Sequence, residues 1–144
     1  MKRIFLLLVA VTATMFQSCD GDTGPQGVPG PAAEVFEVTT DFVPTNDPET
    51  SYRKFFDLNP AIYQSDNVLV YQLSGVVEGK DVWKLLPQVY TFDNGDVLQY
   101  NYDFSYNDFS IFIDANSNLN TLPNTWFNNK TFRVVIVPGY FSSD

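Results

Sequence analysis

The fold is decided by the stretch Val97-Leu98-Gln99-Tyr100-Asn101-Tyr102-Asp103-Phe104-Ser105-Tyr106. Apolar and aromatic side chains occupy every even position from 98 to 106, whereas polar side chains occupy positions 99, 101 and 103. A period of two sustained over ten residues predicts a β-strand with one buried face and one face in water.

The four residues before this strand, Asp93-Asn94-Gly95-Asp96, contain an Asn-Gly pair. Such a pair suits a two-residue type I′ turn, because both central residues of that turn have positive φ. We therefore expect strands at 88–93 and 96–105 to form a hairpin around Asn94 and Gly95.

Further short runs of aromatic and β-branched residues are bounded by Asn, Asp, Gly and Pro. They predict strands at 34–42, 51–57, 67–77, 81–86, 109–114 and 130–137. The last run is apolar on both faces from Phe132 to Val137 except at Arg133, which favours a central strand covered on both sides. We find no amphipathic helical pattern longer than two turns. The predicted fold is all-β, with a single antiparallel β-sandwich domain over residues 34–144.

The first eighteen residues have the pattern of an export signal. Lys2 and Arg3 precede an apolar run from Ile4 to Met15, which is broken only by two threonines. A bilayer-spanning helix needs about 20 apolar residues, so this run is too short for one. A buried first element of the domain is the alternative, but the cationic start favours a signal peptide over residues 1–18.

Cys19 is the only cysteine in the chain, and it stands where signal cleavage is expected. A free thiol in a plain secreted protein is one interpretation. Lipidation is the other, and we favour it, because two or three acyl chains would hold the protein on a membrane. The membrane is thus a predicted partner of the protein, through acyl chains attached to Cys19.

Residues 21–32 consist of four successive G-x-y triplets, which is the collagen pattern and favours an extended polyproline II path. We interpret residues 19–33 as the lipidated cysteine and a semi-rigid spacer of roughly 35 to 40 Å. Four triplets give too few interchain bonds for a triple helix of their own, so a trimer would need support from the folded domains.

Composition excludes several functions. Without Lys2 and Arg3 the chain has 6 basic and 17 acidic residues, a net charge of −11 (6 − 17). This charge disfavours binding to nucleic acid and to anionic lipid. The absence of histidine and of a second cysteine removes the common catalytic triads, imidazole metal sites and redox cysteine pairs. We therefore expect no enzyme, no cofactor and no metal site.

Taken together, the chain resembles the small collagen-like lipoproteins of the Bacteroidota type. The resemblance rests on Phe16-Gln17-Ser18-Cys19 as a lipobox, on the triplets, and on the closing stretches 118–123 and 130–139. Phe16 and Gln17 depart from the usual lipobox, which has Leu and a small residue there. Some members carry the label dihydrolipoamide dehydrogenase, but this chain lacks the cysteine pair and the G-x-G-x-x-G loop of such an enzyme.

The resemblance also implies where the protein resides. Acidic residues after the lipidated cysteine serve as a surface-export signal in this type of bacterium, and Asp20 and Asp22 match that pattern loosely. The expected location is the outer membrane, on the cell surface, with the periplasmic face as the alternative.

Carboxylates are the remaining candidates for chemistry. Glu37, Glu49 and Glu78 could supply a glycosidase-like pair, although their spacing selects none. Asp114, Asn116 and Asn118 place oxygen atoms at alternate positions, as the start of a calcium loop does, but the Gly and the closing Glu of such a loop are missing. An Asn-rich turn is the other interpretation of that segment.

Aromatic residues are abundant, at 21 of the 111 residues from Glu34 onward. Most of them must form the core, but rings near strand ends and loops could stack on a sugar or anchor a partner. The candidate binding residues are Trp83, Trp126, Tyr106 and Tyr140, with Tyr63 as a further one. Packing in the core or at a strand edge is the alternative for each of them.

Three functions remain open. The chain is a lipid-anchored structural or interaction module, such as an accessory subunit of an outer-membrane assembly; or it is a glycan-binding module; or it is a carboxylate glycoside hydrolase. The first is the leading hypothesis. The second would need two or more exposed rings together, and the third would need two carboxyl groups facing each other in a cleft.

Overall fold

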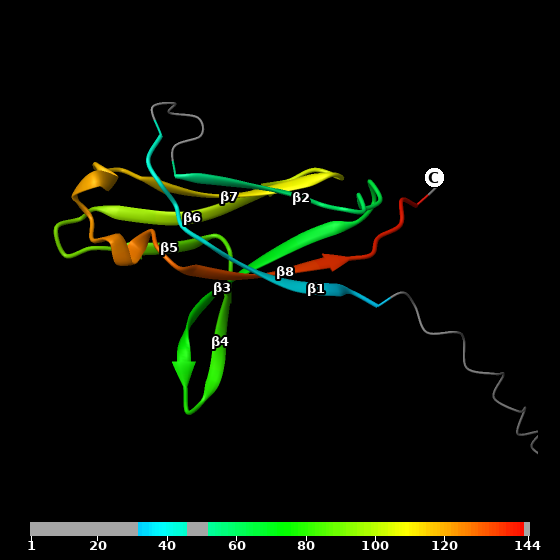
Figure 1. Cartoon of the computed structure of the whole chain (residues 1–144), viewed down its shortest axis with the longest axis horizontal. Helices are drawn as coiled ribbons and strands as arrows, with labels where there is room; N and C mark the ends of the chain where they lie inside the picture. The colour runs from blue at the N-terminus through cyan, green and yellow to red at the C-terminus, as the bar shows by residue number, and fades with distance from the viewer. Residues whose placement is uncertain (1–31, 46–51, 143–144) are drawn as a thin grey trace, which may run out of the picture. The chain divides into compact units, whose positions relative to one another are not determined.

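A computed structural model describes residues 32–45 and 52–142, which form two four-stranded antiparallel sheets (Figure 1). The predicted β-sandwich is confirmed. Its strands are β1 (Glu34–Thr40), β2 (Arg53–Asp57), β3 (Asn67–Val77), β4 (Lys80–Leu85), β5 (Gln88–Thr91), β6 (Val97–Phe104), β7 (Asp108–Ala115) and β8 (Lys130–Val137). Each predicted strand is present, with ends displaced by at most two residues. The predicted signal peptide, Cys19 and the predicted spacer up to residue 31 lie outside the described residues.

The strand order is β1-β8-β3-β4 in one sheet, which we call sheet A, and β2-β7-β6-β5 in the other, sheet B. The first strand thus pairs with the last, and the second pairs with the seventh. Among the described residues, no helix has the length and apolarity needed to cross a membrane.

The core lies between the two sheets and is built from alternate residues of the strands. Val68 and Val70 of β3 and Leu98 and Tyr100 of β6 are at most 1% exposed. The remaining buried apolar residues of the strands are Phe109, Ile111 and Ile113 of β7 and Phe132, Val134 and Ile136 of β8. The predicted period of two in β6 therefore sets its buried face, but Phe104 and Tyr106 are 41% and 52% exposed because they lie at and beyond its end.

The β5–β6 hairpin forms as predicted, but its turn is of a different type. Gly95 has a φ of 86°, whereas Asn94 does not have a positive φ. The Phe92 N–H donates to the Asp96 carbonyl at 2.9 Å, which closes a three-residue loop with a left-handed glycine. The Asn94 side chain accepts a hydrogen bond from the Asp96 N–H at 3.0 Å, so this N–H is satisfied without a positive φ at Asn94.

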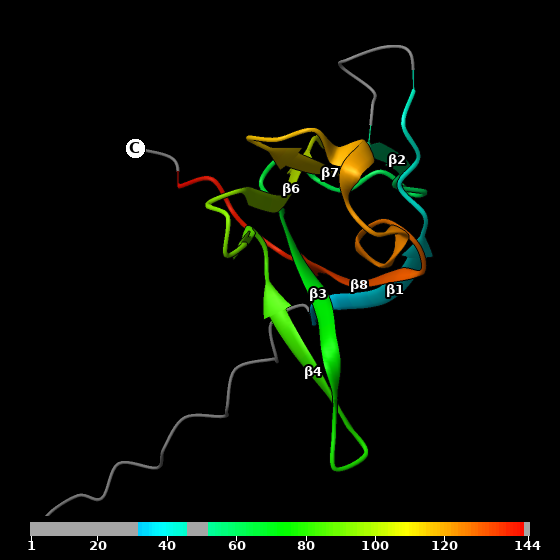
Figure 2. The same ribbon diagram turned by 90° about the vertical axis from the view of Figure 1, so that its left-hand side faces the viewer.

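The turn with two positive φ angles is in the β3–β4 hairpin instead. Glu78 (φ 50°) and Gly79 (φ 75°) connect Val77 to its partner Lys80. Beyond Gln72, β3 has no further pairing with β8 and pairs only with β4. Residues 73–84 therefore form a two-stranded arm that extends away from the sandwich (Figure 2).

The last strand, β8, is central in sheet A, between β1 and β3, as predicted. The prediction that this strand is covered on both sides is wrong for the described residues. Phe132, Val134 and Ile136 face the core, but Val135 and Val137 point outward and are only half-buried. The reason is that the fold has two layers, so the second sheet covers a single face of sheet A.

Candidate functional site

The outer face of sheet A is unusually apolar. In the register of the sheet, Val35 and Leu69 both lie opposite Val135. On the other side of β3, Tyr71 and Leu73 lie opposite Leu85 and Trp83. Because directly opposed residues share a face, these side chains form one surface with Val137. We call this surface the apolar face; it consists of Val35, Leu69, Tyr71, Leu73, Trp83, Leu85, Val135 and Val137.

Arg133 lies within this face, with its charge paired. Its guanidinium donates from Nε and Nη2 to Glu37 Oε1 at 3.0 and 2.7 Å. The guanidinium carbon also lies 4.0 Å from the centre of the Trp83 ring. This cation–π contact and ion pair link β1, β8 and β4, so the face has a fixed shape and no unpaired charge at Arg133.

Trp83 is therefore the predicted binding residue that belongs to the apolar face. Val35 and Leu85 are the most exposed of its members, at 54% and 43%, and the others are half-buried. An outward sheet face in water normally carries polar side chains at these positions. The apolar face thus has the composition of a contact surface.

Trp126, another candidate, does not present a free ring and instead matches the packing alternative. It ends the short 3₁₀ helix η2 (Asn124–Trp126), and its ring packs edge-on against Tyr90 and Phe92, with centroids 5.0 and 5.2 Å apart. The Tyr100 hydroxyl donates to the Trp126 carbonyl and holds this segment on the core. Trp126 is a packing residue, and its ring partners come from a distant part of the chain.

Tyr63, Tyr106 and Tyr140, three further candidate rings, are exposed at 81%, 52% and 84%. They belong to the loop 58–66, the loop 105–107 and the C-terminal segment 138–142, which meet at one end of the sandwich. We call this region the aromatic end; it consists of Tyr63, Phe104, Tyr106, Tyr140 and Phe141. Sequence reasoning missed Phe104 and Phe141 as members.

Hydrogen bonds join the three segments of the aromatic end. The Ile62 N–H donates to the Tyr106 carbonyl at 2.8 Å. The Asp66 carboxylate accepts from the N–H groups of Tyr63 and Gly139, at 3.0 and 3.1 Å. A Cβ at Gly139 would lie 2.0 Å from the carbonyl oxygen of Ser65, so the C-terminal segment can dock here only with glycine at position 139.

A pocket of about 280 Å³ opens at the aromatic end. We call it the aromatic pocket; its lining residues are Ile62, Tyr63, Gln64, Asp66, Phe104, Ser105 and Tyr106. A neighbouring hollow of about 350 Å³ shares Tyr63 and Asp66 and includes Glu34, the first residue of β1. The aromatic end therefore lies beside the start of β1.

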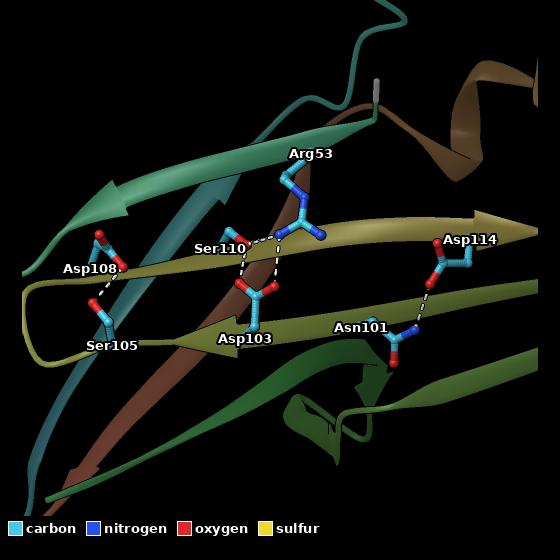
Figure 3. Close-up of polar contacts among 7 residues, drawn as sticks. All are labelled: Arg53, Asn101, Asp103, Ser105, Asp108, Ser110 and Asp114. Carbon is cyan, nitrogen blue, oxygen red and sulfur yellow. Dashed lines mark hydrogen bonds and ion pairs between the residues drawn. The ribbon is translucent and has the colours of Figure 1, made fainter. Parts of the chain in front are cut away.

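The outer face of sheet B carries a polar cluster on three neighbouring strands (Figure 3). Arg53 of β2 donates to Asp103 of β6 at 2.8 Å and to the Ser110 hydroxyl of β7. Ser110 in turn donates to Asp103. Ser110 is only 2% exposed and lies under Arg53, so it is out of reach of a substrate. The cluster ties the strands together and is not a candidate nucleophile site.

The ionisation of the Asp103 carboxyl depends on its neighbours in this cluster. Burial raises the pKa of its carboxyl, but the hydrogen bonds from Arg53 and Ser110 and the charge of Arg53 outweigh burial and leave that pKa below its usual value. The guanidinium also lies over the Phe112 ring, with 3.8 Å between the guanidinium carbon and the ring centre. Asp103 therefore stays ionised and paired.

The three oxygens considered for calcium accept hydrogen bonds from separate donors. Asp114 accepts from the Asn101 side chain at 2.7 Å, Asn116 from the Val97 N–H at 2.7 Å, and Asn118 from the Asn120 N–H at 3.0 Å. Within residues 32–45 and 52–142, no group of three or more Cys, Asp or Glu is disposed to hold a metal ion. These side chains organise strand ends and the turn before η1 (Leu119–Thr121).

The two described glutamates that were considered for a carboxylate pair, Glu37 and Glu78, do not converge. Glu37 is on β1 and is paired with Arg133, whereas Glu78 is in the turn of the β3–β4 arm, across β8 and β3. Glu49 lies outside the described residues. A comparison with protein-family models, curated proteins and solved structures finds no match.

Proposed function

We propose that the chain is a lipid-anchored interaction module that docks a protein partner through the apolar face. One observation carries the proposal: from Phe132 to Val137, β8 is apolar on both sides except at Arg133, as a strand between two covering layers would be, yet the described chain covers only one side. Exposed apolar area costs about 25 cal/mol per Å², so a face of eight apolar side chains favours association.

The distribution of charge supports this choice of surface. Four of the six basic residues that follow Arg3 belong to sheet A: Lys80, Lys84, Lys130 and Arg133. They balance the acidic residues of that sheet, Glu34, Glu37 and Asp81, with Glu78 in its turn. Among the described residues, the excess of negative charge therefore lies on sheet B and in the loops and not on sheet A.

The partner that suits this surface is a different protein with an apolar patch. Two copies of this chain would bring together two domains that each have a net charge of −9 (6 basic and 15 acidic residues from Glu34 onward), which disfavours self-pairing through long-range repulsion. A neutral apolar face imposes little desolvation cost on a partner. Lipidation at Cys19 and display by the spacer would place this face at the cell surface, as part of an outer-membrane assembly.

The test is a pull-down of the native lipoprotein from detergent-solubilised membranes. The double variant Val35→Lys/Leu85→Lys places charges on the apolar face at its two most exposed positions. The control is Val89→Lys, which changes a 57% exposed valine on sheet B. A protein that co-purifies with the wild type and the control, but not with the double variant, is then purified and titrated directly.

The expected result is an affinity loss of at least about tenfold for the double variant, with little change between about 50 and 500 mM salt. Equal affinity of the double variant and the wild type would overturn the assignment of the face. Self-association of the purified chain, measured by light scattering and lost in the double variant, would instead make a second copy the occupant.

Location is tested separately by adding protease to intact cells. Surface display predicts that the domain is digested while periplasmic markers stay whole. Digestion that occurs only after permeabilisation of the outer membrane would place the domain in the periplasm.

A further inference from the structure

The exposed aromatic rings of this domain are concentrated at one place. Six aromatic side chains are classed as exposed among residues 32–45 and 52–142, and five of them form the aromatic end. The sixth is Phe55, 63% exposed on the outer face of sheet B. Water-exposed rings are not needed for the core, which already contains the buried aromatic side chains. Their concentration at the loops indicates a binding function there.

The aromatic pocket combines rings with polar groups. Tyr63, Phe104 and Tyr106 supply the rings, and Gln64, Asp66 and Ser105 supply hydrogen-bonding atoms. The Gln64 side chain makes no hydrogen bond with any other described residue, so its amide can both donate to and accept from a ligand. Each Asp66 oxygen accepts one backbone hydrogen bond and keeps capacity for another.

The walls of the pocket are fixed before any ligand arrives. The bond from Ile62 to Tyr106 joins the two loops, and the Asp66 N–H donates to the Tyr63 carbonyl at 3.0 Å. Ser105 donates to the Asp108 carboxylate at 2.7 Å, which ties the second loop to β7 (Figure 3). A preformed pocket loses little conformational entropy on binding, which is the usual condition for a small-ligand site.

Charge selects the class of ligand. None of the residues that line the aromatic pocket is basic, and Asp66 and the nearby Glu34 are acidic. Phosphate, sulfate and uronic acid groups are therefore disfavoured. Neutral sugars present apolar C–H faces to aromatic rings and hydroxyl groups to amides and carboxylates. A volume of about 280 Å³ is at the lower end of ligand pockets, which suits about one or two sugar rings.

We infer that the aromatic pocket is a binding site for a neutral saccharide, with Tyr63 and Tyr106 as stacking platforms and Gln64 and Asp66 as hydrogen-bonding groups. This site is separate from the apolar face, because it is made of loops at one end of the sandwich. The domain thus has two surfaces of different chemistry, one for a protein and one for a glycan.

The test uses the mature full-length chain with Cys19→Ser, which keeps it unlipidated. The probes are cellohexaose, maltohexaose, laminarihexaose and mannohexaose, titrated by calorimetry and by amide chemical shifts. Polygalacturonate and phosphatidylcholine vesicles are the anionic and lipid alternatives. Tyr63→Ala and Tyr106→Ala are compared with Phe55→Ala, a matched loss of an exposed ring elsewhere.

At least one neutral oligosaccharide should bind, and each tyrosine variant should weaken it by about 3- to 10-fold while Phe55→Ala leaves it unchanged. Tyr63 is 81% exposed, so Tyr63→Ala should keep the wild-type melting temperature and remains interpretable if Tyr106→Ala misfolds. Three results would each overturn the inference: no binding of any neutral probe, equal binding by Tyr63→Ala, or preference for polygalacturonate or vesicles. Retained sugar binding by Val35→Lys/Leu85→Lys would separate this site from the apolar face.

Discussion

Arg53 holds three strands of sheet B together, and its replacement by Met tests this interpretation quantitatively. The substitution keeps much of the apolar stem but removes the ion pair to Asp103, the hydrogen bond to Ser110 and the cation–π contact with Phe112. The side chain of Arg53 is 21% exposed and that of Asp103 is 59% exposed, so the ion pair is largely screened by water. We assign it about 0.5 to 1 kcal/mol.

The other two losses add to this value. The hydrogen bond to the buried Ser110 hydroxyl should contribute about 1 kcal/mol, and the stacking on Phe112 about 0.5 to 1 kcal/mol. The expected destabilisation is therefore about 2 to 3 kcal/mol, which corresponds to a melting temperature lower by roughly 10 °C in a domain of this size.

A double-mutant cycle separates the energy of the Arg53–Asp103 ion pair from that of the other contacts of Arg53. Urea unfolding of Arg53→Met, Asp103→Asn and the double variant should give a coupling energy of about 0.5 to 1 kcal/mol. A loss below about 0.5 kcal/mol for Arg53→Met would refute the reasoning, because surface substitutions without a structural role fall in that range. A coupling energy near zero would show that Asp103 and Arg53 act independently.

Four further predictions follow from particular contacts. Gly95→Val should destabilise the domain by about 1 to 2 kcal/mol in thermal melts, since valine resists the φ of 86°, whereas Asn94→Val should cost less. The pKa of Asp103 is lowered from 3.8 in the folded protein, so the stabilisation of the fold by its ionised carboxylate is present above about pH 4 and is lost as the pH falls. The difference in melting temperature between the wild type and Asp103→Asn should therefore narrow below about pH 4. Gly139→Ala should release residues 139–142, seen as faster amide hydrogen exchange, with little change in overall stability. Cys19→Ala should abolish metabolic labelling with an alkynyl fatty acid, and label retained in this variant would exclude lipidation there.

The strands could be predicted because their signal is local. Period-two alternation from 97 to 104 and the apolar run from 132 to 137 depend on neighbours within the same strand. The turns were less predictable. Asn94-Gly95 has the composition of a type I′ turn, but the Asn94 side chain accepts a hydrogen bond from the Asp96 N–H and a different turn forms. The pair Glu78-Gly79 lacks the usual Asn or Asp at its first position, and yet both of its residues have positive φ. Strand order also could not be predicted, since it depends on contacts between distant segments.

The candidate sites were predictable only in part, for the same physical reason. Tyr63, Tyr106 and Tyr140 could be singled out as rings near loops, but their meeting at one end depends on the bonds from Ile62 to Tyr106 and from Gly139 to Asp66. Trp126 looked equivalent in the sequence and is packed on Tyr90 and Phe92. The signal for the apolar face was present in residues 67–73 and 132–137, where apolar residues occupy both sides of a strand.

That signal has a physical interpretation. A strand with apolar residues on both sides lowers the free energy of the folded chain only when both sides are removed from water. The second sheet covers one side of β8 and β3, and Arg133 covers part of the other by lying over Trp83. Arg133 also neutralises Glu37, so the uncovered surface has fixed side chains and a paired charge before any partner arrives. Such a surface is costly to keep in water and needs little reorganisation to bind, and this combination is what a docking face requires.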